Sequence, residues 1–175
     1  MLSLFLNAYT NKPIFVYKKI YQRLSDIFHQ ESLETIKNEE SKLRTYGLLK
    51  REIGLENYLI DINNPNIRRS VSKFRLSNHS LLIEMGRFKK IQKELRYCPF
   101  CTRTVESEIH FLIHCPTYQA LRIPIMLQAE LKIPGFTFYT DKQKFQYLMS
   151  GECIMITSKF IYNSMQLRDS LVNHS

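Results

Sequence analysis

The sequence predicts a mainly α-helical domain that carries a short hairpin stapled by zinc. Apolar residues recur at steps of three and four along most of the 175 residues, which is the period of an amphipathic helix. Strand-like patterns are confined to residues 14–17, residues 136–139 and the hairpin itself. Three of the four cysteines fall close to a histidine within eighteen residues, and this clustering favours a bound metal.

The first part of the chain predicts two helices. One is expected from Pro13 to about His29, with its apolar stripe buried in the core. The other is expected from about Leu33 to Ile53, because acidic residues gather at its start and basic residues at its end, and Gly54 stops it.

The rest of the chain predicts a connector over residues 58–64 and then further helices. Asn64 and Pro65 suit the cap and first turn of a third helix, and a polar loop is expected between Gly86 and the cysteines. Later helices are expected from Glu106 to Pro116, on to about residue 127, over residues 142–149 after a cap at Thr140 or Asp141, and from Ile154 onward.

The pattern that carries the chemistry is C-x2-C-x8-H-x4-C, formed by Cys98, Cys101, His110 and Cys115. Zn²⁺ takes thiolate and imidazole donors in a tetrahedron, and two cysteines separated by two residues can bind it from one tight turn. Three thiolates and one imidazole fill the four positions, so no bound water is left to activate. The pattern therefore predicts a structural zinc site and no enzyme activity.

His114 is a second candidate for the fourth ligand. If residues 106–114 are helical, His110 and His114 lie on one face, and Pro116 biases Cys115 away from helical dihedral angles. Either histidine could then reach the metal. His110 is preferred because His114 would have to bind alongside its immediate neighbour.

Composition points to one compact domain in a reducing compartment. The chain is 44% hydrophobic and long enough to bury a core. Cys153 has no expected partner, which argues against a secreted disulfide framework. The apolar N-terminus lacks the basic region of a signal peptide, and no stretch has the length of a membrane span. We expect an intracellular protein of the nucleus or cytoplasm, without a membrane or small-molecule partner.

Positive charge is concentrated in one segment. Between Arg68 and Arg103 there are ten basic residues and two acidic ones, in a chain whose net charge is +9. Basic residues that neutralise phosphates supply most of the non-specific affinity for nucleic acids. The expected nucleic-acid face consists of Arg68, Arg69, Lys73, Arg75, Arg87, Lys89, Lys90, Lys93 and Arg96.

Further short motifs accompany the metal pattern. The most specific are an acidic-x-acidic-x-His-Phe-Leu run at residues 106–112 and a Cys-Pro-x-Tyr run at residues 115–118. Others are found at residues 41–46, 74–79, 82–87 and 96–98 and at Arg122. Together they resemble the zinc-binding C-terminal region of the reverse transcriptases of non-LTR retrotransposons, over about residues 41–122.

The resemblance implies that Cys98, Cys101, His110 and Cys115 hold the metal and that the region helps to hold RNA or DNA. It does not imply polymerase activity, because the paired catalytic aspartates of such enzymes have no counterpart here. It also suggests that His79 and Arg87 organise the turn before the cysteines.

These observations divide the chain into a helical extension (1–40), the zinc-binding region with its basic face (41–125), and C-terminal helices that pack on it (126–175). The expected function is non-catalytic binding of RNA or DNA, largely without sequence preference. The alternative is a zinc-stabilised module that binds other proteins, because a basic face can also meet an acidic protein.

Overall fold

The structure is a computed structural model, and it describes residues 3–37, 42–50 and 54–173. The expected helix end at Ile53 lies outside these ranges. The described residues are mainly helical, as predicted, with about 73% in helices. Their β-structure is limited to one isolated antiparallel bridge between Tyr97 and Val105.

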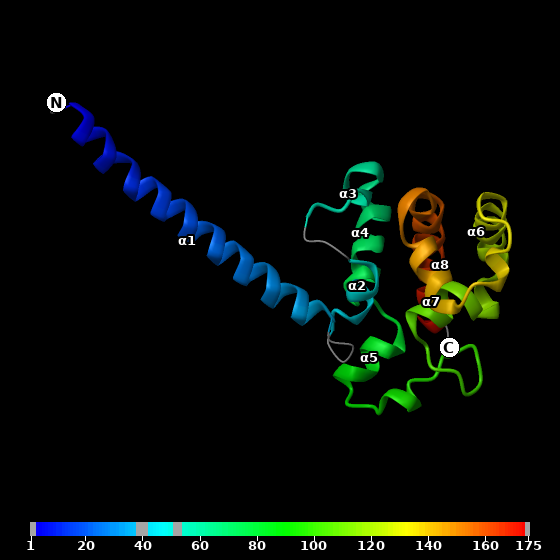
Figure 1. Ribbon diagram of the computed structural model, residues 1–175. Coiled ribbons are helices and arrows are strands. Elements are labelled where there is room, and N and C mark those ends of the chain that lie inside the picture. Colours follow the sequence, from blue (N-terminus) through cyan, green and yellow to red (C-terminus); the bar gives the residue numbers. More distant parts are fainter. Residues whose placement is uncertain (1–2, 38–41, 51–53, 174–175) are drawn as a thin grey trace.

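The first helix, α1, runs without interruption from Ser3 to Lys37 and projects away from the rest of the molecule (Figure 1). It joins the two segments that the sequence analysis had separated, because residues 29–33 contain no glycine or proline to break it. The expected burial of its apolar stripe is wrong. Tyr17 is 76% exposed and Leu24 is 61% exposed, since no other described element covers this length of α1.

Helix α2, Arg44–Leu49, anchors α1 to the body of the molecule. An added Cβ at Gly47 would collide with the backbone carbonyl of Ile36, so glycine permits the close approach of the two helices. The short α3, Tyr58–Asp61, lies within the expected connector.

The body is built on the packing of α4, Pro65–Arg75, against α8, Ile154–Asn173 (Figure 1). The predicted Asn64 cap is confirmed, because its side-chain oxygen accepts hydrogen bonds from the N–H groups of Asn66 and Ile67 at 2.9 and 3.3 Å. Val71 and Phe74 of α4 are fully buried, so the apolar side of this helix faces the core.

Two more helices complete this core. They are α6, Gln119–Lys132, and α7, Asp141–Leu148. Thr140 caps α7 in a capping box, in which its side chain and that of Gln143 each accept a hydrogen bond from the other residue's backbone N–H. Of the two predicted caps, Thr140 and Asp141, the first is therefore confirmed. The strand-like residues 136–139 instead include a 3₁₀ turn, η4, Phe136–Phe138, in which Phe136 is buried.

Helix α5, Leu82–Phe88, and the 3₁₀ turn η1, Lys93–Leu95, lead from α4 to the cysteines. A π-helical turn, η2, His110–His114, and a 3₁₀ turn, η3, Pro116–Tyr118, follow them, and η5, Gly151–Cys153, precedes α8. None of the helices in the described parts of the chain combines the length and apolar content needed to cross a membrane.

Candidate metal centre and basic groove

The four predicted ligands converge in the folded chain. One donor atom from each of Cys98, Cys101, His110 and Cys115 lies within 4.8 Å of all the others. The Cys115 sulfur is 3.9 Å from that of Cys98 and 3.7 Å from that of Cys101. Disulfide sulfurs lie about 2.0 Å apart, so these are free thiols grouped around a common point. The arrangement is close enough to hold one metal ion.

The loop that carries the first two cysteines is closed at its base. Tyr97 and Val105 form the antiparallel bridge, and the N–H of Cys98 donates to the carbonyl of Thr104 at 2.7 Å. The N–H of Cys101 donates back to the carbonyl of Cys98 at 3.3 Å, which turns both sulfurs to the same side. The predicted hairpin is therefore a tight loop with a single bridge.

The other two ligands come from the ends of η2. The N–H of Cys115 donates to the carbonyl of His110 at 2.7 Å, a bond that spans five residues and widens the turn. Cys115 then leaves the helix with φ −57° and ψ 119°, outside the helical region, as expected of a residue before Pro116. His114 is turned outward, where its Nε2 lies 2.7 Å from Asp141. His110 is therefore the histidine of the cluster.

Both ring nitrogens of His110 are buried and have no hydrogen-bond partner among the described residues. Such an arrangement is costly for a polar group, and a metal bound at one nitrogen removes part of that cost. Burial lowers the pKa of His110, so the imidazole is neutral at pH 7 and able to bind a cation. The donor set and its burial therefore fit a metal.

Burial shifts the pKa values of the thiols upward, whereas it shifts the pKa of His110 downward. Burial raises the pKa of Cys98 to about 12 and also raises the pKa of Cys101, so both carry protons without a metal. Metal binding must displace those protons, because the thiolate is the ligand form.

Arg122 of α6 contacts the backbone of the turn that carries His110 and Cys115. Its guanidinium is buried and donates to the carbonyls of Phe111, Leu112 and Cys115 at 3.2, 2.9 and 2.6 Å. These carbonyls lie at the end of η2, where the helix cannot satisfy them itself. The charge of Arg122 also opposes the negative charge that thiolates would place beside it. Only the quoted resemblance had drawn attention to this residue.

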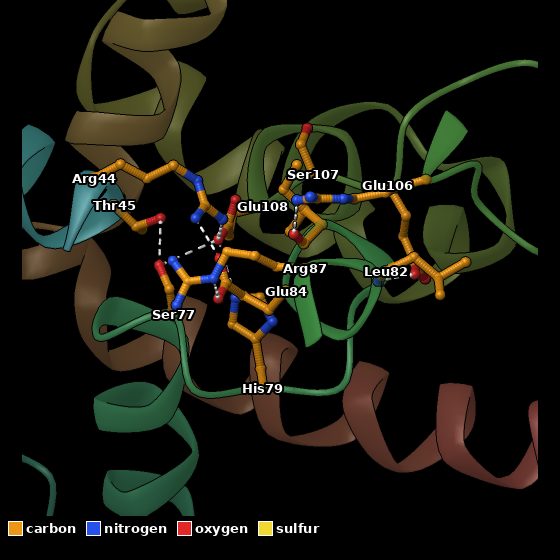
Figure 2. A network of polar contacts seen from close by, with 12 residues as sticks. Arg44, Thr45, Ser77, His79, Leu82, Glu84, Arg87, Glu106, Ser107 and Glu108 are labelled. Atoms are coloured by element: carbon orange, nitrogen blue, oxygen red, sulfur yellow. Dashed lines mark hydrogen bonds and ion pairs between the residues drawn. The ribbon is translucent and has the colours of Figure 1, made fainter. Parts of the chain in front are cut away.

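Figure 2 shows a network of buried ion pairs, to which Glu106 and Glu108 contribute just before His110 of the cluster. Arg44 of α2 donates to Glu84 of α5 and, at 2.6 Å, to Glu108. The Nε2 of His79 lies 3.0 Å from the same Glu108 oxygen, and Ser77 donates to it at 3.4 Å. His79 thus pairs with a carboxylate, and not with the backbone carbonyl typical of a buried histidine. The pKa of Glu108 is lowered by its partners His79 and Arg44, although its burial acts in the opposite direction.

Glu106 is the centre of a second set of contacts in this network. Its carboxylate receives two hydrogen bonds from Arg168 of α8, at 2.7 and 2.8 Å, and one from the N–H of Leu82 at 2.6 Å. Both charged side chains are at most 5% exposed. The pair ties the last helix to the start of α5 and to the cysteine loop. Nothing in the sequence spacing had singled out Arg168.

The predicted basic residues divide into two groups. Arg75 is 4% exposed and bonds Glu56 and the carbonyl of Met149, so it belongs to the core. Arg68 and Arg96 are half-buried and donate to backbone carbonyls, and Arg87 is half-buried 3.7 Å from Glu84. The members with exposed side chains are Arg69, Lys73, Lys89, Lys90 and Lys93.

A groove of about 690 Å³ lies between α4, α5 and α8. Arg69 and Lys73 line it from α4, and Phe88 lines it from the end of α5. Phe88 is 68% exposed, and Tyr162 of α8 lines the same groove. Two exposed cations and the exposed ring of Phe88 therefore meet in one depression, together with the half-buried Tyr162 and with Asp169.

No protein-family model, curated protein or solved structure matches the chain.

Proposed function

We propose that the chain is a non-catalytic module that binds RNA or DNA, and that a structural Zn²⁺ holds it together at the Cys98, Cys101, His110 and Cys115 cluster. Support for zinc comes from the sulfur separations of 3.7 and 3.9 Å. Thiolates 2.3 Å from a tetrahedral Zn²⁺ lie about 3.8 Å apart. A set of four protein ligands leaves zinc no open position for a substrate or a catalytic water.

The observation that supports nucleic-acid binding is the groove in which Arg69 and Lys73 face the solvent beside Phe88. Cations that follow a phosphate chain, together with a ring on which a base can stack, are what single-stranded nucleic acids require. Lys89, Lys90 and Lys93 extend the exposed positive charge beyond Phe88 along the chain. Phosphate contacts of this kind carry no sequence information, so binding is expected to be largely independent of sequence.

The test is fluorescence anisotropy with labelled single-stranded RNA and DNA of several sequences, measured over a series of NaCl concentrations. For each phosphate that the wild-type protein contacts, the logarithm of its association constant is expected to fall by roughly 0.7 for every tenfold increase in NaCl concentration. Replacing Arg69 and Lys73 by Gln, or Lys89, Lys90 and Lys93 by Gln, is expected to weaken binding to every sequence alike and to flatten the salt dependence. Phe88→Ala is expected to cost about 1–3 kcal/mol on single strands.

The matched control replaces Lys142 and Lys144 of α7 by Gln, because these cations do not line the groove. It removes the same charge as the Arg69 and Lys73 variant and is expected to leave binding nearly unchanged. Equal effects from the two variants would mean that net charge alone attracts the nucleic acid. Absence of any salt-dependent binding at low ionic strength would refute the proposal and favour a protein-binding module.

A further inference from the structure

The apolar stripe of α1 is the largest feature of the molecule that its metal centre and groove leave unexplained. Helix α1 has 35 residues, which corresponds to about 50 Å of length. It meets the body at α2, near its C-terminal end, and the rest projects outward (Figure 1). Most helical stability in proteins comes from packing of the apolar face, so a long exposed stripe indicates a missing partner.

The spacing of the stripe specifies the kind of partner. Tyr17, Ile20, Leu24 and Ile27 follow one another at steps of three, four and three, which is the seam of a coiled coil. Each of them is at least 42% exposed. Tyr21 and Phe28 flank the seam on one side and are 70% and 63% exposed. The surface therefore fits another amphipathic helix.

The charges of α1 indicate how that helix is oriented. Among the described side chains of α1, Lys18 and Lys19 precede Gln22, whereas one cation and three acids follow it, and all six are exposed. The residues after Gln22 are Arg23, Asp26, Glu31 and Glu34, so the first half is net basic and the second half is net acidic. Two copies of α1 side by side in parallel would place like charges together. Two antiparallel copies place the basic half of each along the acidic half of the other, which favours association and fixes its direction.

An antiparallel pair also keeps the seam in register. With Gln22 at the centre, Tyr17 of one copy faces Ile27 of the other, and Ile20 faces Leu24. Every apolar residue of the seam then meets an apolar residue. We propose that α1 is a self-association helix, and that two copies of this chain pair through it as an antiparallel coiled coil. The nucleic-acid proposal is independent of this one.

The test is sedimentation equilibrium of the full chain, with zinc in the buffer, over a wide range of protein concentration. The expected species has twice the mass of the chain. Replacing Ile20 and Leu24 by Glu would bury unpaired charges in the seam and is expected to raise the dissociation constant at least about 100-fold. Bound metal and circular dichroism report whether the body of that variant stays folded.

The matched control introduces the same two charges at Gln22 and His29, which lie on the opposite face of the same helix. This variant is expected to remain a dimer. A wild-type protein that stays monomeric at every concentration would overturn the proposal. So would equal weakening by the control, because the seam would then have no special role.

The orientation has its own test, by oxidation in the presence of zinc of variants that each add one cysteine to the native four. Tyr17→Cys mixed with Ile27→Cys is expected to form a cross-linked dimer, because the two positions face each other in the antiparallel pair. Tyr17→Cys alone is expected to form none. Efficient cross-linking of Tyr17→Cys to itself would show a parallel pair and contradict the antiparallel one.

Discussion

The metal cluster and the ion-pair network hold overlapping parts of the chain, but they are completed in different ways. In the network, the buried carboxylates of Glu106 and Glu108 meet arginines of α8 and α2. In the cluster, the buried ring of His110 meets no hydrogen-bond partner at either nitrogen within the described part of the chain. The carboxylates of the network thus find counter-charges within the protein, although Glu84 Oε2 and His79 Nδ1 lack a hydrogen bond among the described residues. The cluster, by contrast, brings together four residues that are close enough to hold a metal ion.

Glu106, Glu108 and His110 follow one another at intervals of two residues, and each contacts a different part of the fold. Glu106 binds the last helix, Glu108 binds α2, and His110 joins the cysteines. One short segment therefore connects three parts of the fold. Removing the metal and breaking an ion pair should affect different regions, and this difference can be measured.

The largest effect is expected from removal of the metal. Cys98→Ser is expected to abolish stoichiometric zinc and to unfold residues 97–118, because zinc binding of this kind contributes on the order of 10 kcal/mol that is coupled to folding. Metal analysis and hydrogen exchange would measure both effects. The control is Cys153→Ser, since Cys153 is buried but outside the cluster. Full zinc content in Cys98→Ser would remove this residue from the ligand set.

The clustering of Cys98, Cys101, His110 and Cys115 could be predicted from the sequence, because their residue types suit a metal site and their spacing is local. The ion-pair network could not. Arg168 is 62 residues from Glu106, and Arg44 is 64 residues from Glu108. Charge patterns in a sequence show which residues carry charge, but not which distant segment the fold brings beside them.

The same limit explains the two partial failures. The period of residues 17–28 correctly predicted a helix, yet a period cannot show whether the apolar face meets the chain's own core or another surface. Arg75 was grouped with the basic face because its neighbours in sequence are basic. Its partners Glu56 and Met149 come from segments that α4 meets only in the folded structure.

The second prediction concerns the fully buried pair. Arg168→Ala leaves the Glu106 carboxylate buried without its counter-charge, and breaking such a pair costs about 3–5 kcal/mol. Urea denaturation of the zinc-loaded protein would measure the free energy of unfolding. Lys159→Ala serves as control, because Lys159 is an exposed cation of the same helix. If the two variants were equally stable, the Arg168 pair would not be a structural tie.

A smaller loss is expected at the other end of the network. Arg44 is 19% exposed, so water can partly replace it beside Glu84 and Glu108. Arg44→Ala is therefore expected to lower the free energy of unfolding by about 1–3 kcal/mol, less than Arg168→Ala. Zinc content should be unchanged in both variants. Loss of zinc in Arg44→Ala would show that the network and the metal cluster fold as one unit.

The smallest loss of zinc and stability is expected from substitution of His114. Comparing it with substitution of His110 shows which histidine of η2 binds the metal. His110→Ala removes a ligand and is expected to lose zinc. His114→Ala removes only the contact with Asp141, in which both side chains are 49% exposed. Exposed pairs contribute less than about 1 kcal/mol because water and salt screen them. His114→Ala should therefore keep its zinc and nearly all its stability, and zinc loss there with retention in His110→Ala would reverse the assignment of the fourth ligand.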